Sequence, residues 1–265
     1  MNIKKLATTC LMLCVAASAL AQDDRFASVT IETVPVTGNI SMLIGSGGNI
    51  GVSTGSDGLL IIDDQYGPLA AKIRAALSQL SSDTPKFLLN THFHGDHTGG
   101  NADFGVASII IAHENVRGRL VAGDSPGSAL PVITFDEDVT VHFNGENITL
   151  IHMPRGHTDT DSVVMFEESN VIHMGDHFFN GGFPFVDLAS GGTVQGYISN
   201  LEKALSWIDD DTSVIPGHGP LGTKADLLAF YNVVKDTSTT IRVMKSQQMS
   251  AEEAVAEGLG DEYES

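Results

Sequence analysis

Thr91-His92-Phe93-His94-Gly95-Asp96-His97 is the stretch of this sequence that decides its fold. It places four potential metal ligands within six residues, directly after residues 86–90, an apolar run that predicts a buried strand. Imidazole and carboxylate groups suit zinc, and a strand end holds them rigidly. The first two histidines are two residues apart and can face the same way, whereas the aspartate and the last histidine follow a glycine and can turn elsewhere. The motif therefore predicts two metal ions rather than one.

Three more candidate ligands stand at the ends of later apolar runs, and each of them adjoins or lies close to glycine. They are His157, Asp176 and His218. Small neighbours let a ligand side chain turn into a crowded site without steric clash. A single histidine at a strand end is more often an ordinary solvated loop residue, but this alternative is weak for the clustered motif. Together the side chains fill two metal sites if one carboxylate bridges them.

Apolar runs of strand length occur in two clusters, and helical periodicity follows each cluster. Residues 29–63 predict a strand meander, and residues 139–152 predict a hairpin around Asn144-Gly145. The other predicted elements are strands at 86–90, 109–112, 162–166, 171–175 and 213–216, and helices at 69–80, 114–121, 194–208 and from 223 onward, with a capping box at 250–253. This order predicts an α/β fold with two mixed β-sheets packed face to face and helices outside.

The N-terminus has the three regions of a secretory signal, namely Lys4 and Lys5, an apolar run at 6–15 and small residues ending at Ala21. The apolar run is shorter than the ~20 residues needed to cross a bilayer, which disfavours a membrane anchor. We therefore expect residues 1–21 to be removed on export to the periplasm or outside the cell. Residues 22–265 are expected to form one domain.

Cysteine content and net charge limit which ligands and partners the exported chain can have. The only cysteines of the sequence, Cys10 and Cys14, lie in the predicted signal, so disulfides and thiolate metal ligands are not expected after its removal. The formal net charge of −19 repels nucleic acid and disfavours anionic membranes. A simpler interpretation of this acidity is that it keeps an exported protein soluble. The expected partner is a small-molecule substrate.

Taken in order along the chain, Asp63, the motif at 92–97, His157, Asp176 and His218 resemble the metal-binding pattern of the metallo-β-lactamase superfamily. The resemblance covers nearly the whole mature chain and implies a four-layer αββα sandwich. The ligand sets that it implies are His92, His94 and His157 for the first ion and Asp96, His97 and His218 for the second. Asp176 would contact the second ion or bridge both, and Asp63 would orient the ligand loop from behind.

The downstream spacing is most similar to the β-lactamase subclass that has three histidines in its first site, but two positions depart from it. Asp176 stands where that subclass has a cysteine, as in glyoxalase II and lactonase relatives, and Phe179 stands where a substrate-anchoring lysine is common. Arg155 is the nearest candidate to replace that lysine in substrate binding. Phe179 also belongs to an aromatic group that forms either a substrate wall or part of the core. The group comprises Phe178, Phe179, Phe183 and Phe185.

Two Zn²⁺ ions are the expected cofactors, with iron and manganese as alternatives. Such a pair lowers the pKa of a bound water from about 15.7 to about 7 and supplies hydroxide as the nucleophile. Asp96 is the candidate catalytic residue, which would relay a proton to the leaving group. The first hypothesis is β-lactamase-like hydrolysis of a small cyclic amide or ester, and the second is a lactonase or thioesterase. An iron-dependent enzyme similar to persulfide dioxygenases and a non-catalytic metal-binding protein are further alternatives.

Overall fold

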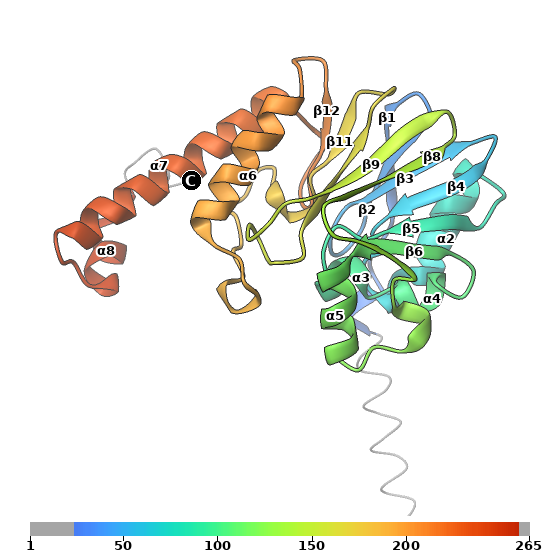
Figure 1. Cartoon of the computed structure of the whole chain (residues 1–265), viewed down its shortest axis with the longest axis horizontal. Coiled ribbons are helices and arrows are strands. Elements are labelled where there is room, and N and C mark those ends of the chain that lie inside the picture. The colour runs from blue at the N-terminus through green and yellow to red at the C-terminus, as the bar shows by residue number, and fades with distance from the viewer. Residues whose placement is uncertain (1–23, 260–265) are drawn as a thin grey trace, which may run out of the picture.

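The computed structural model describes residues 24–259, so the predicted signal at residues 1–21 lies outside the described part. Within it, two sheets lie face to face, with helices on both outer faces (Figure 1). Both sheets contain parallel and antiparallel pairs. The four-layer αββα sandwich expected from the sequence is therefore confirmed.

The first sheet has seven strands in sequence order. The first four form the predicted antiparallel meander, and the fourth strand also begins a parallel set with the last three. Its strands are β1 (Glu32–Thr37), β2 (Ile40–Ile44), β3 (Ile50–Gly55), β4 (Gly58–Ile62), β5 (Pro85–Leu89), β6 (Ile109–His113) and β7 (Ile133–Phe135). Because β4 and β5 are parallel, Asp63 and the ligand motif leave the sheet at the same edge.

The second sheet has six strands in the order β13-β12-β11-β10-β9-β8. Its strands are β8 (Asp138–Phe143), β9 (Glu146–His152), β10 (Ser162–Phe166), β11 (Val171–His173), β12 (Ser213–Ile215) and β13 (Gly222–Thr223). Asn144 and Gly145 both have positive φ, 56° and 79°, as the tight turn of the predicted hairpin requires. The short strands β7 and β13 were not expected, because two or three residues carry too little periodicity to be recognised.

Helices and single helical turns cover the sheets and connect their strands. The α-helices are α2 (Ala70–Leu80), α3 (Gly95–Thr98), α4 (Asn101–Phe104), α5 (Glu114–Ala122), α6 (Val194–Trp207), α7 (Lys224–Ser246) and α8 (Ala251–Glu257). The 3-10 turns are η1 (Asp24–Phe26), η2 (Gly67–Leu69), η3 (Gly127–Ala129), η4 (Gly175–His177) and η5 (Leu188–Ser190). The predicted capping box at Ser250 is confirmed, since its side chain accepts from the Glu253 amide.

The main core lies between the sheets, where alternate strand residues of both inner faces meet. Leu60 and Leu89 from the first sheet and Val164 and Phe166 from the second are almost completely buried there. Burying such a side chain contributes about 1.5–3 kcal/mol relative to leaving it exposed. Two further cores lie under α2 and under α6 and α7. The strand ends that carry the candidate ligands therefore rest on a rigid scaffold.

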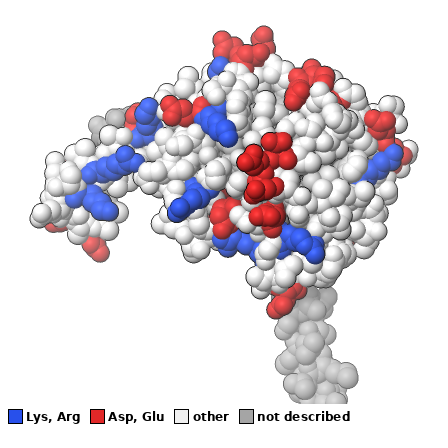
Figure 2. Space-filling model, in the orientation of Figure 1, with Lys and Arg blue, Asp and Glu red and all other residues white. Residues whose placement is uncertain are grey.

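Figure 1 shows the second half of α7 and α8 projecting from the body as an arm. Over the visible face, acidic side chains gather in a band, and several Lys and Arg side chains lie along this arm (Figure 2). None of the helices within residues 24–259 combines the length and the hydropathy that a membrane crossing requires.

Two histidines at strand ends, His113 at the end of β6 and His152 at the end of β9, stack on each other. His113 and His152 lie with ring centroids 3.7 Å apart and planes at 11°. His113 Nδ1 accepts from the Asn115 amide, so its Nε2 donates to the Asp136 carbonyl at 2.9 Å. His152 Nδ1 lies 2.8 Å from the carbonyl of Asp161. Burial lowers the pKa of His113, and burial together with His113 lowers the pKa of His152.

This stack predicts a loss of stability in mild acid. Below the ordinary histidine pKa of about 6.5 the unfolded chain takes up protons that the folded stack resists, so the free energy of unfolding falls as pH drops. Each histidine contributes a slope of at most about 1.4 kcal/mol per pH unit. Urea unfolding of the wild type and of His152→Gln between pH 8 and pH 5 measures the free energy of unfolding. From pH 8 to pH 5 it should fall less in the variant than in the wild type. The exposed His142→Gln is the control, and parallel pH curves for all three proteins would contradict the prediction.

Candidate metal centre

Asp63 holds the ligand loop from behind. It follows β4 with a positive φ of 62° and is completely buried. Its carboxylate accepts from the Thr91 amide at 2.8 Å, from the Thr91 hydroxyl at 2.7 Å and from His97 Nδ1 at 2.7 Å. Hydrogen bonds to an ionised group contribute about 1.5–3 kcal/mol each. One carboxylate therefore restrains both ends of the motif, which is the position that the family resemblance implied for Asp63.

Three histidine nitrogens converge in a first group. His94 Nδ1 lies 3.2 Å from His92 Nε2 and 2.8 Å from His157 Nε2. His92 and His94 come from the loop after β5, and His157 comes from the loop between β9 and β10. Chain segments 63 residues apart in sequence are thus brought into contact.

Asp96, His97 and His218 form a second group beside the first, with one potential ligand atom of each lying within 4.8 Å of the others. Asp96 Oδ2 is 3.4 Å from His218 Nε2 and 3.8 Å from His97 Nε2. Asn49 stands directly before β3. Its side-chain amide donates to the carbonyls of Pro216 and Gly219 and so holds the segment that carries His218.

Asp176 lies between the two groups. Its Oδ2 is 3.4 Å from His157 Nε2 and 3.8 Å from His92 Nε2, whereas its Oδ1 is 3.0 Å from His97 Nε2 and 3.3 Å from His218 Nε2. One carboxylate oxygen faces each group, which is the arrangement of a bridging ligand. All the ligands expected from the sequence therefore meet in one place.

The protonation pattern shows that the converging nitrogens are bare. His157 Nδ1 must donate to the Phe185 carbonyl at 2.7 Å, because a carbonyl only accepts. His94 Nε2 donates in the same way to Asp187 Oδ2 at 3.1 Å. In their neutral forms both histidines therefore turn lone pairs, not protons, towards the centre of the first group.

The same reasoning applies to the two remaining histidines of the motif. The Thr91 hydroxyl donates to Asp63, so it accepts from His92 Nδ1 at 3.0 Å and leaves His92 Nε2 without a proton. His97 Nδ1 donates to Asp63, and its buried Nε2 has no hydrogen-bond partner. The buried Oδ1 of Asp176 lies 3.0 Å from this nitrogen and also has no hydrogen-bond partner, so both atoms are unsatisfied while His97 is neutral. Converging lone pairs and unsatisfied buried atoms fit a bound cation in this site.

The electrostatics of the site agree with this fit. Burial opposes charge on Asp176, yet His97 and His92 hold the pKa of this carboxyl well below its usual range. Burial also disfavours a charged His97, but Asp176 and Asp63 outweigh it and raise the pKa of His97 well above the usual value. The buried carboxylates thus require positive charge beside His97, which a metal ion supplies as well as a proton does.

An open cavity of about 420 Å³ lies over the two groups. Its lining residues are Tyr66, His94, Gly95, Asp96, Asp176, Phe179, Phe185 and His218. The Phe179 ring stacks on the His218 ring at 5.1 Å and 11°. Among the residues that the structure describes, neither Lys nor Arg lines this cavity.

The aromatic group at 178–185 divides between two roles. Phe179 and Phe185 line the cavity, whereas Phe178 is completely buried against α6 and α7, and Phe183 is exposed away from the lining. Arg155, the candidate for substrate binding, has an exposed side chain that is not part of this lining, and its role in substrate binding stays a prediction. The Thr193 side chain donates to the Arg155 carbonyl and holds its backbone near the start of α6.

Sequence reasoning missed several residues that complete the site. Thr91, directly before His92, could have been suspected from its position in the motif. Tyr66, Gly48 and Asp187 carried no such signal, because they approach the ligands only through the fold. The pKa of Asp187 is lowered to about 2, since hydrogen bonds from Ser190 and His94 outweigh its partial burial.

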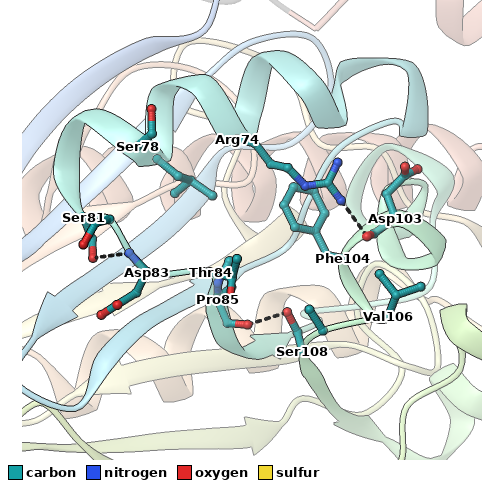
Figure 3. A pocket seen from close by; sticks show the side chains of 13 residues that line it. Arg74, Ser78, Ser81, Asp83, Thr84, Pro85, Asp103, Phe104, Val106 and Ser108 are labelled. Carbon is teal, nitrogen blue, oxygen red and sulfur yellow. Dashed lines mark hydrogen bonds between the residues drawn. The ribbon is translucent and has the colours of Figure 1, made fainter.

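A second cavity, of about 340 Å³, lies between the C-terminal end of α2 and the segment after α4 (Figure 3). Two of its polar side chains, Arg74 and Ser108, are already paired locally. Arg74 donates to the Asp103 carbonyl and covers the Phe104 ring, and Ser108 donates to the Pro85 carbonyl. This cavity holds no converging nucleophile, base or ligand set, so the chemistry belongs to the histidine site.

A sandwich of two mixed sheets that carries clustered histidines and aspartates at one edge is typical of a class of metal-binding proteins. The profile of the Metallo-beta-lactamase superfamily matches residues 37–218. The chain belongs to this superfamily.

The sequence of this chain is similar to parts of several curated proteins. A hydroxyacylglutathione hydrolase from Polaromonas sp. (strain JS666) is 34% identical over 135 residues, which are 49% of this chain and 47% of that protein. An atrochrysone carboxyl ACP thioesterase from Aspergillus terreus is 28% identical over 52% of this chain and 40% of its own length. The chain thus spans about half the length of these relatives.

Solved structures share the fold. A metallo-beta-lactamase from Pontibacter korlensis superimposes with a TM-score of 0.66 at 15% identity and covers 78% of this chain and 99% of its own. The DIM-1 metallo-beta-lactamase gives a TM-score of 0.65 at 18% identity over 78% and 99% of the two chains.

Proposed function

We propose that the chain is a dinuclear zinc hydrolase that cleaves the acyl C–O or C–S bond of a small ester, thioester or lactone. The observation that carries the proposal is the position of Asp176, with one carboxylate oxygen towards each of two ligand groups. His92, His94 and His157 would hold the first ion, and Asp96, His97 and His218 the second. Bound zinc supplies an activated water at neutral pH and polarises the substrate carbonyl.

The protein's own residues orient the reactants and move the proton. Asp96 is partly exposed at the cavity floor, so its carboxylate can take a proton from the attacking water and pass it to the leaving group. Phe179 and Phe185 form apolar walls that exclude water from one side of the substrate. The buried hydrogen bonds of Asp63 keep the ligand loop fixed during this exchange.

Two features favour esters and thioesters over β-lactams. The relatives named as a hydroxyacylglutathione hydrolase and an acyl-carrier thioesterase act, by their names, on thioesters. By the family resemblance, Phe179 stands where a substrate-anchoring lysine is common, and neither Lys nor Arg is among the described residues that line the cavity. Hydrolysis of a cyclic amide is the second candidate, which the fold of the DIM-1 structure supports.

Metal content and a substrate panel test the proposal together. Purified protein stripped with a chelator is expected to lose hydrolysis reversibly, and two equivalents of zinc per chain should restore it. A thioester and a neutral lactone should be turned over at least about tenfold faster, in kcat/KM, than a chromogenic β-lactam. His142→Ala, which removes an exposed histidine outside both groups, should still bind two zinc ions.

Each alternative has its own result. A β-lactam turned over fastest would favour the cyclic amide. Iron bound in place of zinc, together with oxygen consumption, would favour the redox enzyme. Two bound zinc ions without turnover of any substrate would overturn the proposed substrate class.

A further inference from the structure

The loop between η4 and α6 contacts two ligands of the first group from outside. The Phe185 carbonyl accepts from His157 Nδ1, and Asp187 Oδ2 accepts from His94 Nε2. Phe185 also lines the cavity, with its ring centroid 5.8 Å from that of His157 and 6.3 Å from that of His94. Residues 185–187 therefore form part of the substrate wall and hold two ligands at the same time.

Asp187 is itself held in place. Its amide donates to the His157 carbonyl at 2.8 Å, and its carbonyl accepts from Gly192 at 3.0 Å. Its second carboxylate oxygen accepts from the Ser190 amide at 3.1 Å. The Asp187 side chain is 18% exposed, so the hydrogen bond to His94 is partly shielded from water. Asp187 is thus a restrained acceptor and not a freely moving surface carboxylate.

His94 depends on this acceptor more than the other motif histidines depend on theirs. His92 and His97 are almost completely buried and are held through the Asp63 network, whereas the His94 side chain is 20% exposed. Without a partner at Nε2, the His94 ring can rotate about its side-chain bonds and turn Nδ1 away from the group. A carboxylate that accepts a hydrogen bond from a ligating histidine also makes the histidine more basic, so its other ring nitrogen binds a metal ion more strongly.

We propose that Asp187 is a positioning residue of the first metal site, which fixes His94 with Nδ1 towards the metal. This inference rests on the proposed dinuclear function, because it assigns the first group to a metal. It concerns a residue that touches neither the ion nor the reacting atoms. Removing the side chain is expected to weaken one of the two metal sites by about 10–100-fold and to leave the other unchanged.

The test compares Asp187→Ala and Asp187→Asn with Leu188→Ala, which removes an exposed neighbouring side chain from the same loop. Co²⁺ titrations followed by absorption report the affinity of each site in the full chain. Asp187→Ala should lose affinity at one site, and Leu188→Ala at none. Asp187→Asn should be intermediate, because an amide oxygen accepts from His94 but its nitrogen then opposes the Ser190 amide.

Proton NMR of the ring N–H groups provides a readout that needs no turnover and no metal. In the wild type, the His94 Nε2 proton should exchange slowly with water, and in Asp187→Ala its signal should disappear. The His157 Nδ1 proton, held by the Phe185 carbonyl, should persist in both proteins. An unchanged His94 signal and unchanged Co²⁺ affinity in Asp187→Ala would overturn the proposal. A wild type that binds two metal ions but hydrolyses nothing would overturn only the proposed substrate class.

Discussion

Replacing Asp176 by alanine is expected to reduce kcat/KM by at least about 10³-fold, which corresponds to about 4 kcal/mol of transition-state stabilisation. The reason is geometric. Within residues 24–259, Asp176 is the one side chain with an oxygen towards each ligand group, 3.4 Å from His157 Nε2 on one side and 3.0 Å from His97 Nε2 on the other. Its loss removes a ligand from both sites together with the negative charge that a pair of cations requires.

Metal stoichiometry and steady-state kinetics measure this effect, with Asp176→Asn separating charge from shape. The amide keeps the size of the side chain but loses its charge, so metal binding should remain strongly impaired. Asp64→Asn is the matched control, because Asp64 is another buried carboxyl near the site. Burial and the neighbouring Asp63 raise the pKa of Asp64 well above its usual range, and an amide oxygen can still accept from the Gly100 amide, so the substitution is a small change there. Two tightly bound metal ions in Asp176→Asn would contradict the assignment.

The second large effect is expected from a glycine outside the motif. A Cβ on Gly48 would lie 2.1 Å from His97 Cε1 and 2.5 Å from His97 Nδ1. His97 cannot retreat, since it is completely buried and held by Asp63 at 2.7 Å. Gly48→Ala should therefore lower the free energy of unfolding by about 1–3 kcal/mol and weaken the second metal site at least about tenfold.

Gly95 provides the control for this prediction. It lies inside the ligand motif, yet a Cβ at this position would meet nothing within 4 Å. Gly95→Ala should bind two metal ions and change the free energy of unfolding by no more than about 0.5 kcal/mol. Thermal unfolding and metal titration compare the stability and the metal affinity of Gly48→Ala and Gly95→Ala. The prediction fails if Gly95→Ala is the more damaging substitution.

Most of the sandwich could be predicted because strand and helix periodicities are local properties of the sequence. The hairpin at Asn144-Gly145 is an example, since two residues with positive φ determine the turn. Strands β7 and β13 are too short to show a period, and they owe their place to pairing with β6 and β12. Arg155 lies outside the cavity lining although it is close to His157 in sequence, because proximity in sequence says nothing about which way a loop side chain points.

By itself, the sequence determined the class of chemistry, because ligand types at strand ends are chemical facts that do not depend on the exact path of the chain. The candidate ligands and the two packed sheets with helices outside followed from the pattern of residues, and the role of Asp63 was implied by the family resemblance. Only the tertiary structure decided how the site is completed, namely that Asp176 faces both groups, that Gly48 packs on His97 and that Asp187 holds His94. Those contacts join residues up to 93 positions apart, and no periodic pattern records them. They arise when the two sheets pack and bring their loops to one edge.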